Sequence, residues 1–133
     1  MISRLDHVAI VTKDLAASLR FFEEQLGLLC THQEELPDRG IRVAMLPIGD
    51  PRIELIESLH DKSEVSGFLE KRGPGLHHLC FHSDAIEADM EHIKAQGGQL
   101  TSDAPKPGAH GCQVAFVHPK STGGVLVELL NPL

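Results

Sequence analysis

The sequence predicts an α+β fold built from two tandem βαβββ modules. Each module opens with an apolar run whose third residue is histidine, His7 in Leu5–Ile10 and His78 in Leu76–Phe81. Each closes with an apolar strand that carries one glutamate, Glu54 or Glu128. A repeated unit of about 60 residues exposes a sheet face that it cannot cover alone, so two copies are expected to fold together.

An amphipathic helix is predicted directly after each opening strand. The apolar residues recur at spacings of three and four, which places them on one helical face. Acidic residues stand where a helix start needs a cap, and glycines stand where each helix should end. The apolar positions are Leu15, Leu19 and Phe22 in the first copy and Ile86, Met90 and Ile93 in the second, with Asp14 and Asp84 as caps.

Short β-type runs separated by turn residues follow each helix. They are expected at Leu28–Thr31, Ile41–Pro47 and Arg52–Ile56 in the first copy, and near Leu100, at Gln113–His118 and at Val125–Leu130 in the second. The histidines lie 71 residues apart and the glutamates 74, so three residues were added in the loops of the second copy. The predicted organisation is a single domain over 1–133, with modules at 1–59 and 75–133 joined by a linker at 60–74 that holds a short helix near Glu64–Arg72.

Composition excludes several classes of function. The net charge is −7, and there is no Trp or Tyr to stack on bases, so nucleic acid and anionic membrane are not expected partners. No apolar run approaches the 18 residues that a bilayer span needs. The unpatterned cysteines Cys30, Cys80 and Cys112 are typical of reduced thiols in a cytoplasmic protein, and the strand-like start at Met1–His7 leaves no room for a signal peptide.

The repeat also predicts a metal site. Because side chains alternate along a strand, His7 and Glu54 can share a face, as can His78 and Glu128. Two imidazoles and two carboxylates suit a divalent ion of the Zn, Co, Ni or Mn type, which would also remove the cost of burying a carboxylate in apolar strands. The competing interpretation is that each residue is simply exposed on a solvent face.

The remaining histidines are not expected to bind the metal. His77 adjoins His78 and therefore points to the other face, as a surface or supporting residue. Four further histidines have no counterpart in the other copy and are expected to be solvated: His32, His60, His82 and His92.

Longer motifs resemble a known superfamily. Phe68–His78, Pro105–Gly111 and His118–Leu129 are similar to those of the vicinal-oxygen-chelate superfamily, and within it to the methylmalonyl-CoA epimerases, over essentially all 133 residues. The resemblance implies an open eight-stranded cup-like mixed sheet and a divalent metal, with Co favoured, on His7, Glu54, His78 and Glu128. It also implies a homodimer.

The activity implied by the resemblance is epimerisation of (R)- and (S)-methylmalonyl-CoA, by removal of the α-proton and stabilisation of the enolate on the metal. Glu128 is the leading candidate for one acid–base group, and Glu54 is its symmetric partner. Val43 stands where some relatives have a glutamate base, so the second base is not fixed by the resemblance. Cations near loops could meet an acyl-CoA thioester substrate: Arg39, Arg42, Lys71, Arg72, Lys106 and Lys120.

Three other functions are compatible with the repeat. A lactoylglutathione lyase of the glyoxalase I type would use the same four residues, but its last turn would have an Asp-Pro-Asp-Gly pattern, whereas this turn has His118–Gly124. A metal-free protein that sequesters small molecules would not need the four residues. An extradiol dioxygenase needs only two histidines and one carboxylate, and Glu54 would crowd its open positions.

Overall fold

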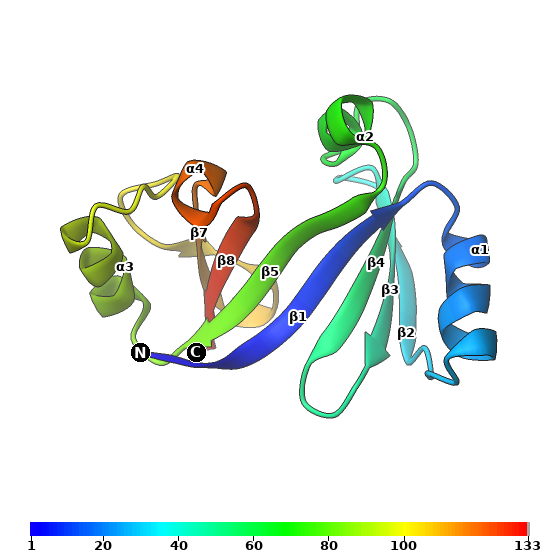
Figure 1. Ribbon diagram of the computed structural model, residues 1–133, viewed down its shortest axis with the longest axis horizontal. Coiled ribbons are helices and arrows are strands. Elements are labelled where there is room, and N and C mark those ends of the chain that lie inside the picture. The colour runs from blue at the N-terminus through cyan, green and yellow to red at the C-terminus, as the bar shows by residue number, and fades with distance from the viewer. Residues whose placement is uncertain (133) are drawn as a thin grey trace. The chain divides into compact units, whose positions relative to one another are not determined.

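The computed structural model describes residues 1–132 and contains an eight-stranded mixed sheet in the order β2-β3-β4-β1-β5-β8-β7-β6 (Figure 1). The predicted eight-stranded α+β fold is thereby confirmed. The chain divides into two compact units, one of residues His7–His77 and one of Met1–Asp6 with His78 onward. None of the helices in the described part of the chain has the length and apolar character needed to cross a membrane.

The first unit contains the second half of β1 and the elements that follow it as far as the start of β5. Its elements are β1 (Ile2–Thr12), α1 (Leu15–Arg20), the π-helical turn η1 (Phe21–Gln25), β2 (His32–Leu36), β3 (Ile41–Pro47), β4 (Arg52–Ser58) and α2 (Ser66–Arg72). The second unit has β5 (Gly75–Ser83), α3 (Ile86–Ala95), β6 (Lys106–Pro107), the 3-10 turn η2 (Ala109–Gly111), β7 (Gln113–Val117), α4 (Pro119–Thr122) and β8 (Leu126–Asn131).

Strand register repeats between the units. β1 pairs in parallel with β4, where Ala9 faces Glu54, and β5 pairs in parallel with β8, where Cys80 faces Glu128. In each unit the glutamate therefore lies opposite the residue two positions after the histidine. The three added residues of the second copy fall between β7 and β8, where α4 forms.

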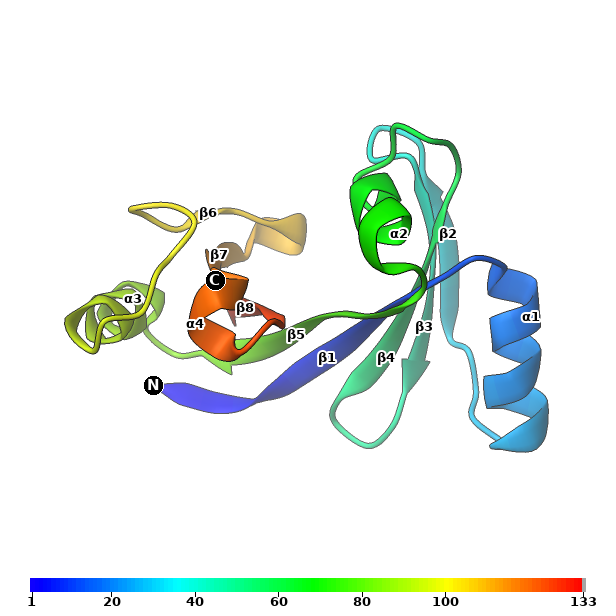
Figure 2. The ribbon, with the colours of Figure 1, turned by 45° about the horizontal axis from the view of Figure 1, so that its top comes forward.

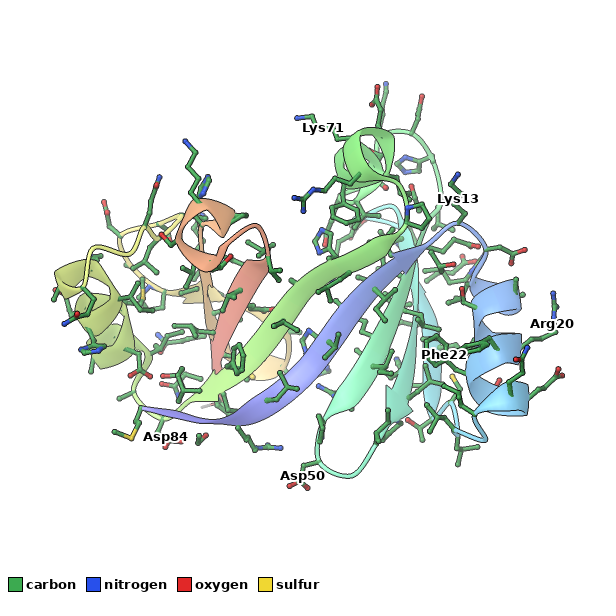
Figure 3. The ribbon with its side chains drawn as sticks, viewed as in Figure 1. Lys13, Arg20, Phe22, Asp50, Lys71 and Asp84 are labelled. Carbon is green, nitrogen blue, oxygen red and sulfur yellow. The ribbon has the colours of Figure 1, made fainter. Side chains whose placement is uncertain are left out.

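Helices α1 and α2 lie on opposite faces of the strands of the first unit (Figures 1 and 2), and an apolar cluster lies under each helix. Leu15 and Leu19 of α1 pack against Ala44, Leu46 and Leu55, and Phe22 points from the helical segment toward the strands (Figure 3). On the other face, α2 supplies side chains that cover the strands, with Phe68 and Leu69 packed against a buried cluster of Ala9, Val11, Ile41, Val43, Ile56 and Val65.

The N-cap residues of the helices differ between the two copies. Asp14 caps α1 as predicted, by accepting a hydrogen bond from the backbone N–H of Ala17. The predicted cap of α3 at Asp84 is wrong, because the N-cap residue is Ala85 and its side chain has nothing to accept with. Instead, Oδ1 of Asn131 on β8 accepts from the N–H of Ile86, so a distant strand satisfies the first turn of this helix.

Two predicted strands are also wrong. Leu28–Thr31 is not a strand, because Leu28 and Cys30 pack against the α1 cluster while the chain crosses toward the sheet. The first strand after the helix is β2, an edge strand whose polar sequence lacks the alternation on which the prediction depends. Near Leu100 there is only an isolated bridge to Val117, and the edge strand β6 has two residues, since Pro107 cannot donate to a ladder.

Candidate active site

The first half of the candidate site lies on β1 and β4. The parallel register sets His7 and Glu54 on one face, two positions apart along the ladder. Nε2 of His7 lies 3.7 Å from Oε1 of Glu54, and the two side chains are 10% and 15% exposed. This unit therefore directs an imidazole and a carboxylate toward one point while shielding both from most solvent.

The second half of the candidate site repeats this pair on β5 and β8. Nε2 of His78 lies 3.3 Å from Oε1 of Glu128, with side chains 11% and 13% exposed. The directly paired residue, Cys80, is fully buried, as is its counterpart Ala9 in the first unit. Each half-site thus has the same two donor types, the same register and a small buried residue beside the carboxylate.

This donor set fits a divalent metal ion. Imidazole nitrogen and carboxylate oxygen are the ligands that Zn, Co, Ni and Mn ions accept, and in each unit the two donor atoms lie within 3.7 Å of one another. A partly buried carboxylate beside an imidazole is also suited to proton transfer, since the low local polarity strengthens its interactions.

Sequence reasoning missed the cross-strand neighbours of the two carboxylates. Met45 on β3 lies directly opposite Glu54, and Phe116 on β7 lies directly opposite Glu128. The two are 71 residues apart, the same spacing as His7 and His78, so the repeat contained the signal that would have identified them. Both side chains are partly buried and share the face of the carboxylates.

Val43, where some relatives have a glutamate, is buried in the apolar cluster beneath α2 and is 3% exposed. Its cross-strand partner on β2 is Glu34, whose carboxylate lies 3.1 Å from Nε2 of His32 on the exposed edge strand. An acid at position 43 would be enclosed by apolar side chains, and Val43 contributes to the packing of this cluster. The carboxylate next to His7 is that of Glu54.

One histidine prediction was wrong. His82 is not solvated: its Nε2 lies 2.7 Å from Oδ1 of Asp6, and the side chains are only 12% and 10% exposed. The ring of His77 is partly buried and meets Phe68 edge-on at 4.9 Å. The remaining histidines without counterparts are exposed as expected, at positions 32, 60 and 92.

The six cations that were expected to meet an acyl-CoA substrate, and through it the phosphates of coenzyme A, fall into two groups in the structure. Arg39 forms a two-pronged ion pair with Glu64. Arg42 contacts Glu35 at 2.5 Å and Glu57 at 2.7 Å. The hydrogen bond that its guanidinium donates to Glu35, followed by the charges of both carboxylates, raises the pKa of the guanidinium. Both arginines are therefore engaged by carboxylates of their own unit. The other four cations near loops have exposed side chains: Lys71, Arg72, Lys106 and Lys120.

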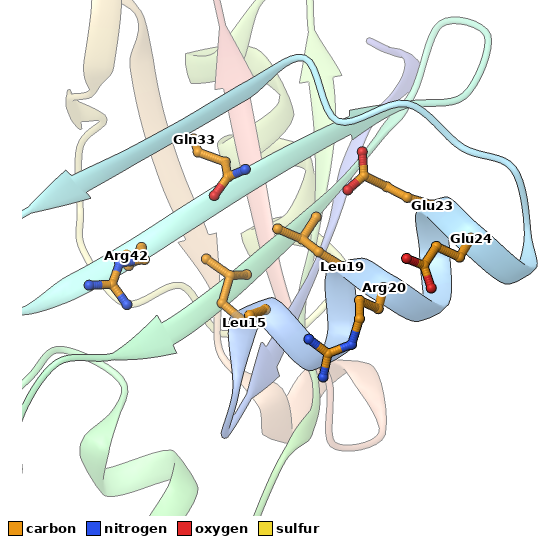
Figure 4. Close-up of a pocket in the computed structure, with 8 residues that line it drawn as sticks. Leu15, Leu19, Arg20, Glu23, Glu24, Gln33 and Arg42 are labelled. Atoms are coloured by element: carbon orange, nitrogen blue, oxygen red, sulfur yellow. The ribbon is translucent and has the colours of Figure 1, made fainter.

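A cavity of about 480 Å³ lies beside α1, on the face opposite His7 (Figure 4). Its walls mix apolar residues of the helix with charged ones of both signs, including Arg20, Glu23, Glu24 and Arg42. Because α1 packs on the face of Ala44 and Leu55, this cavity is separate from the histidine–glutamate pair of the same unit.

The eight-stranded fold and the repeated histidine–glutamate pair agree with the class of protein that comparison with known proteins identifies. Residues 6–116 match the model of the Glyoxalase/Bleomycin resistance protein/Dioxygenase superfamily, and the chain belongs to that superfamily. It is 40% identical over 131 residues to the ethylmalonyl-CoA/methylmalonyl-CoA epimerase of Cereibacter sphaeroides, covering 97% of this chain and 98% of the relative. Mitochondrial methylmalonyl-CoA epimerase of Mus musculus is 39% identical over 129 residues, covering 96% and 72%.

Solved structures give the same result. A variant of Streptomyces coelicolor methylmalonyl-CoA epimerase in complex with 2-nitronate-propionyl-CoA superposes with a TM-score of 0.84 at 33% identity, covering 99% of both chains. The predicted resemblance to the methylmalonyl-CoA epimerases is thereby confirmed. A lactoylglutathione lyase of Arabidopsis thaliana is more distant, at 24% identity over 128 residues and 44% of its own length.

Proposed function

We propose that this chain interconverts the (R)- and (S)-epimers of methylmalonyl-CoA by removing the C2 proton and returning it to the opposite face. The observation that carries this proposal is the duplicated half-site: each unit brings one imidazole and one partly buried carboxylate to within 3.7 Å of one another at the same strand register. The epimerase relatives that span nearly the whole chain support the same substrate class, a thioester of a 2-alkylmalonate.

The chemistry explains why two carboxylates are needed. The C2 hydrogen lies between a thioester carbonyl, which acidifies it, and a free carboxylate, which opposes the build-up of negative charge. Inversion requires that the proton leaves one face of C2, which becomes planar, and that a proton returns on the other face. Glu128 takes the first role and Glu54 the second, and each positioned acid–base group typically contributes on the order of 10²–10⁴-fold to the rate.

The imidazoles complete a ligand set for a divalent ion. His7, Glu54, His78 and Glu128 would hold it, and Co is favoured among Co, Mn, Ni and Zn by the resemblance to the epimerases. When bound, such an ion supplies Lewis-acid stabilisation of the negative charge on the substrate oxygens as the C2 proton leaves. A homodimer in the cytoplasm, acting on an acyl-CoA thioester, completes the proposal.

Hydrogen exchange at C2 in heavy water tests the proposal directly. Each pure epimer of methylmalonyl-CoA is incubated with the protein, and deuterium at C2 is followed by NMR while inversion is followed by chiral analysis. The wild type should exchange and invert both epimers. A wild type that leaves C2 protonated under every metal condition would overturn the assignment.

The two glutamates are separated by their amide variants. Glu128→Gln and Glu54→Gln should each abolish inversion, and each should suppress exchange from one epimer more than from the other. Glu34→Gln is the matched control. It makes the same substitution on the same face of the sheet, but on the edge strand β2, where the carboxylate lies opposite Val43 and not beside His7 or His78. Equal exchange from both epimers in either amide variant would remove that glutamate from its assigned role.

Metal content supplies a readout independent of turnover. The protein is stripped with chelator, reloaded with Co, Mn, Ni or Zn, and analysed by elemental mass spectrometry. We expect one ion per chain, with binding weakened in His7→Ala and His78→Ala but not in His92→Ala, whose parent side chain is exposed on α3. Stoichiometric binding that survives both of the first two substitutions would place the ion elsewhere.

A further inference from the structure

We propose that Met45 and Phe116 form matched apolar walls that limit the size of the alkyl group on C2 of the substrate. The inference rests on the proposed function and goes beyond it by assigning residues to substrate selection. Its basis is the register: Met45 lies directly opposite Glu54, and Phe116 lies directly opposite Glu128, each within one unit.

Directly opposed residues of an antiparallel pair have Cβ atoms about 4.5–5.5 Å apart on the same face. Each carboxylate therefore has a large apolar side chain as its immediate neighbour on one side. On its other side is a small and fully buried residue, Ala9 next to Glu54 and Cys80 next to Glu128. Because Ala9 and Cys80 have no exposed surface, the partly exposed Met45 and Phe116 are the neighbours of the carboxylates that a substrate group can contact.

The two walls are not explained by core packing. Met45 and Phe116 are only partly buried, and they lie outside the apolar clusters that form under α1, α2 and α3. Their strand neighbours Ala44 and Ala115 point to the opposite face and do belong to those clusters. The walls thus present apolar surface on the face of the carboxylates.

The inversion explains why each unit has such a wall. When the thioester and carboxylate groups stay fixed during inversion, the hydrogen and the alkyl group at C2 exchange faces. The alkyl group of one epimer therefore lies on the face of C2 that carries the hydrogen in the other epimer. Each half-site must therefore offer a base and an apolar contact, and each has both.

The expected change in substrate preference can be estimated from how strongly apolar pockets discriminate between alkyl groups of different length. One added methylene in an apolar pocket is typically discriminated by about 10–200-fold. Met45→Ala and Phe116→Ala should each remove that discrimination on one face and raise the ratio of kcat/KM for ethylmalonyl-CoA over methylmalonyl-CoA by about tenfold. The equilibrium constant of each substrate fixes the ratio of its forward and reverse kcat/KM. The increase in the ethyl-to-methyl ratio must therefore be the same whichever epimer is the starting substrate, whereas KM for ethylmalonyl-CoA should fall further for one epimer than for the other.

The experiment measures exchange and inversion of both thioesters by wild type, Met45→Ala and Phe116→Ala. Val114→Ala is the control, because it trims an apolar residue on the same strand face that lies opposite Leu130 instead of a carboxylate. Met45→Phe tests the opposite direction and should lower the ethyl-to-methyl ratio. Thermal unfolding of each variant establishes that the measured protein is folded. If the Ala variants do not fold, Met45→Phe still tests the inference, because it enlarges the side chain instead of truncating it.

An increased ratio in both Ala variants, a decreased ratio in Met45→Phe and an unchanged ratio in Val114→Ala would support the inference. Equal losses on both thioesters in the Ala variants, or a change in Val114→Ala as large as theirs, would overturn it. A wild type inactive on methylmalonyl-CoA would instead refute the proposed function, so the two failures are distinguishable.

Discussion

Glu57 joins three elements of the first unit, and its removal is expected to destabilise the fold far more than removal of a neighbouring acid. Its Oε2 accepts a hydrogen bond from the N–H of Leu15 at 2.8 Å, which caps the first turn of α1. Its Oε1 accepts from Arg42 on β3 at 2.7 Å, and the side chain is 16% exposed. Glu35 contacts the same guanidinium, but it lies on the edge strand and is 54% exposed.

The expected magnitudes differ accordingly. Losing a cap costs about 1 kcal/mol. A charge-assisted hydrogen bond from a partly buried carboxylate contributes about 1 kcal/mol more after allowance for solvent screening. Glu57→Ala should therefore lower the free energy of unfolding by about 2 kcal/mol, a fall of about 7 °C in Tm for a chain of 133 residues. Glu57→Gln keeps one acceptor for the Leu15 N–H and should lose about half as much.

Differential scanning calorimetry and urea titration provide the measurement, with Glu35→Ala as the matched control. An exposed ion pair contributes about 0–1 kcal/mol, so the control should shift Tm by no more than about 3 °C. Equal Tm losses for Glu35→Ala and Glu57→Ala would refute the reasoning, because they would show that the contact with Arg42 matters and the helix cap does not.

Two further predictions concern residues whose partners became visible in the fold. Arg39→Gln and Arg42→Gln should leave KM for methylmalonyl-CoA unchanged in initial-rate assays, since both guanidiniums are engaged by carboxylates; a severalfold rise in KM would reassign them to phosphate binding. His82→Ala should lower the free energy of unfolding by about 2 kcal/mol, because the shielded contact with Asp6 is lost. His92→Ala is the control and should change the free energy of unfolding by no more than about 0.5 kcal/mol, since His92 is exposed. Equal Tm values for the two variants would contradict this prediction.

The repeat explains how much of the fold could be predicted from the sequence. His7, His78, Glu54 and Glu128 are recognisable because the same local pattern occurs twice, and strand periodicity alone assigns each pair to a face. The edge strands were missed or misplaced because they bury little and so lack alternating polarity. A prediction that depends on apolar periodicity finds the strands that carry the site more readily than the strands at the borders of the sheet.

Contacts between distant segments could not be predicted in the same way. The pairing of Asp6 with His82, and that of Arg42 with Glu57, depends on which residues face one another after the strands are aligned. Neither pair is repeated in the second copy, so no internal comparison revealed it. The walls at Met45 and Phe116 could be predicted in part. Their spacing of 71 residues is visible in the sequence, but only the strand register shows that each residue lies opposite a carboxylate.

The position of the three added residues shows how the two half-sites remained equivalent. An odd insertion within a strand moves every following side chain to the other face, which would turn Glu128 away from His78. The extra residues instead lie in the connection between β7 and β8, which contains α4. Nδ1 of His118 caps this turn by accepting from the N–H of Lys120, and Gly123 ends it in the left-handed conformation at φ 83°. The chain therefore enters β8 with Glu128 opposite Phe116, as Glu54 is opposite Met45, and a reaction that inverts its substrate requires this equivalence of its two faces.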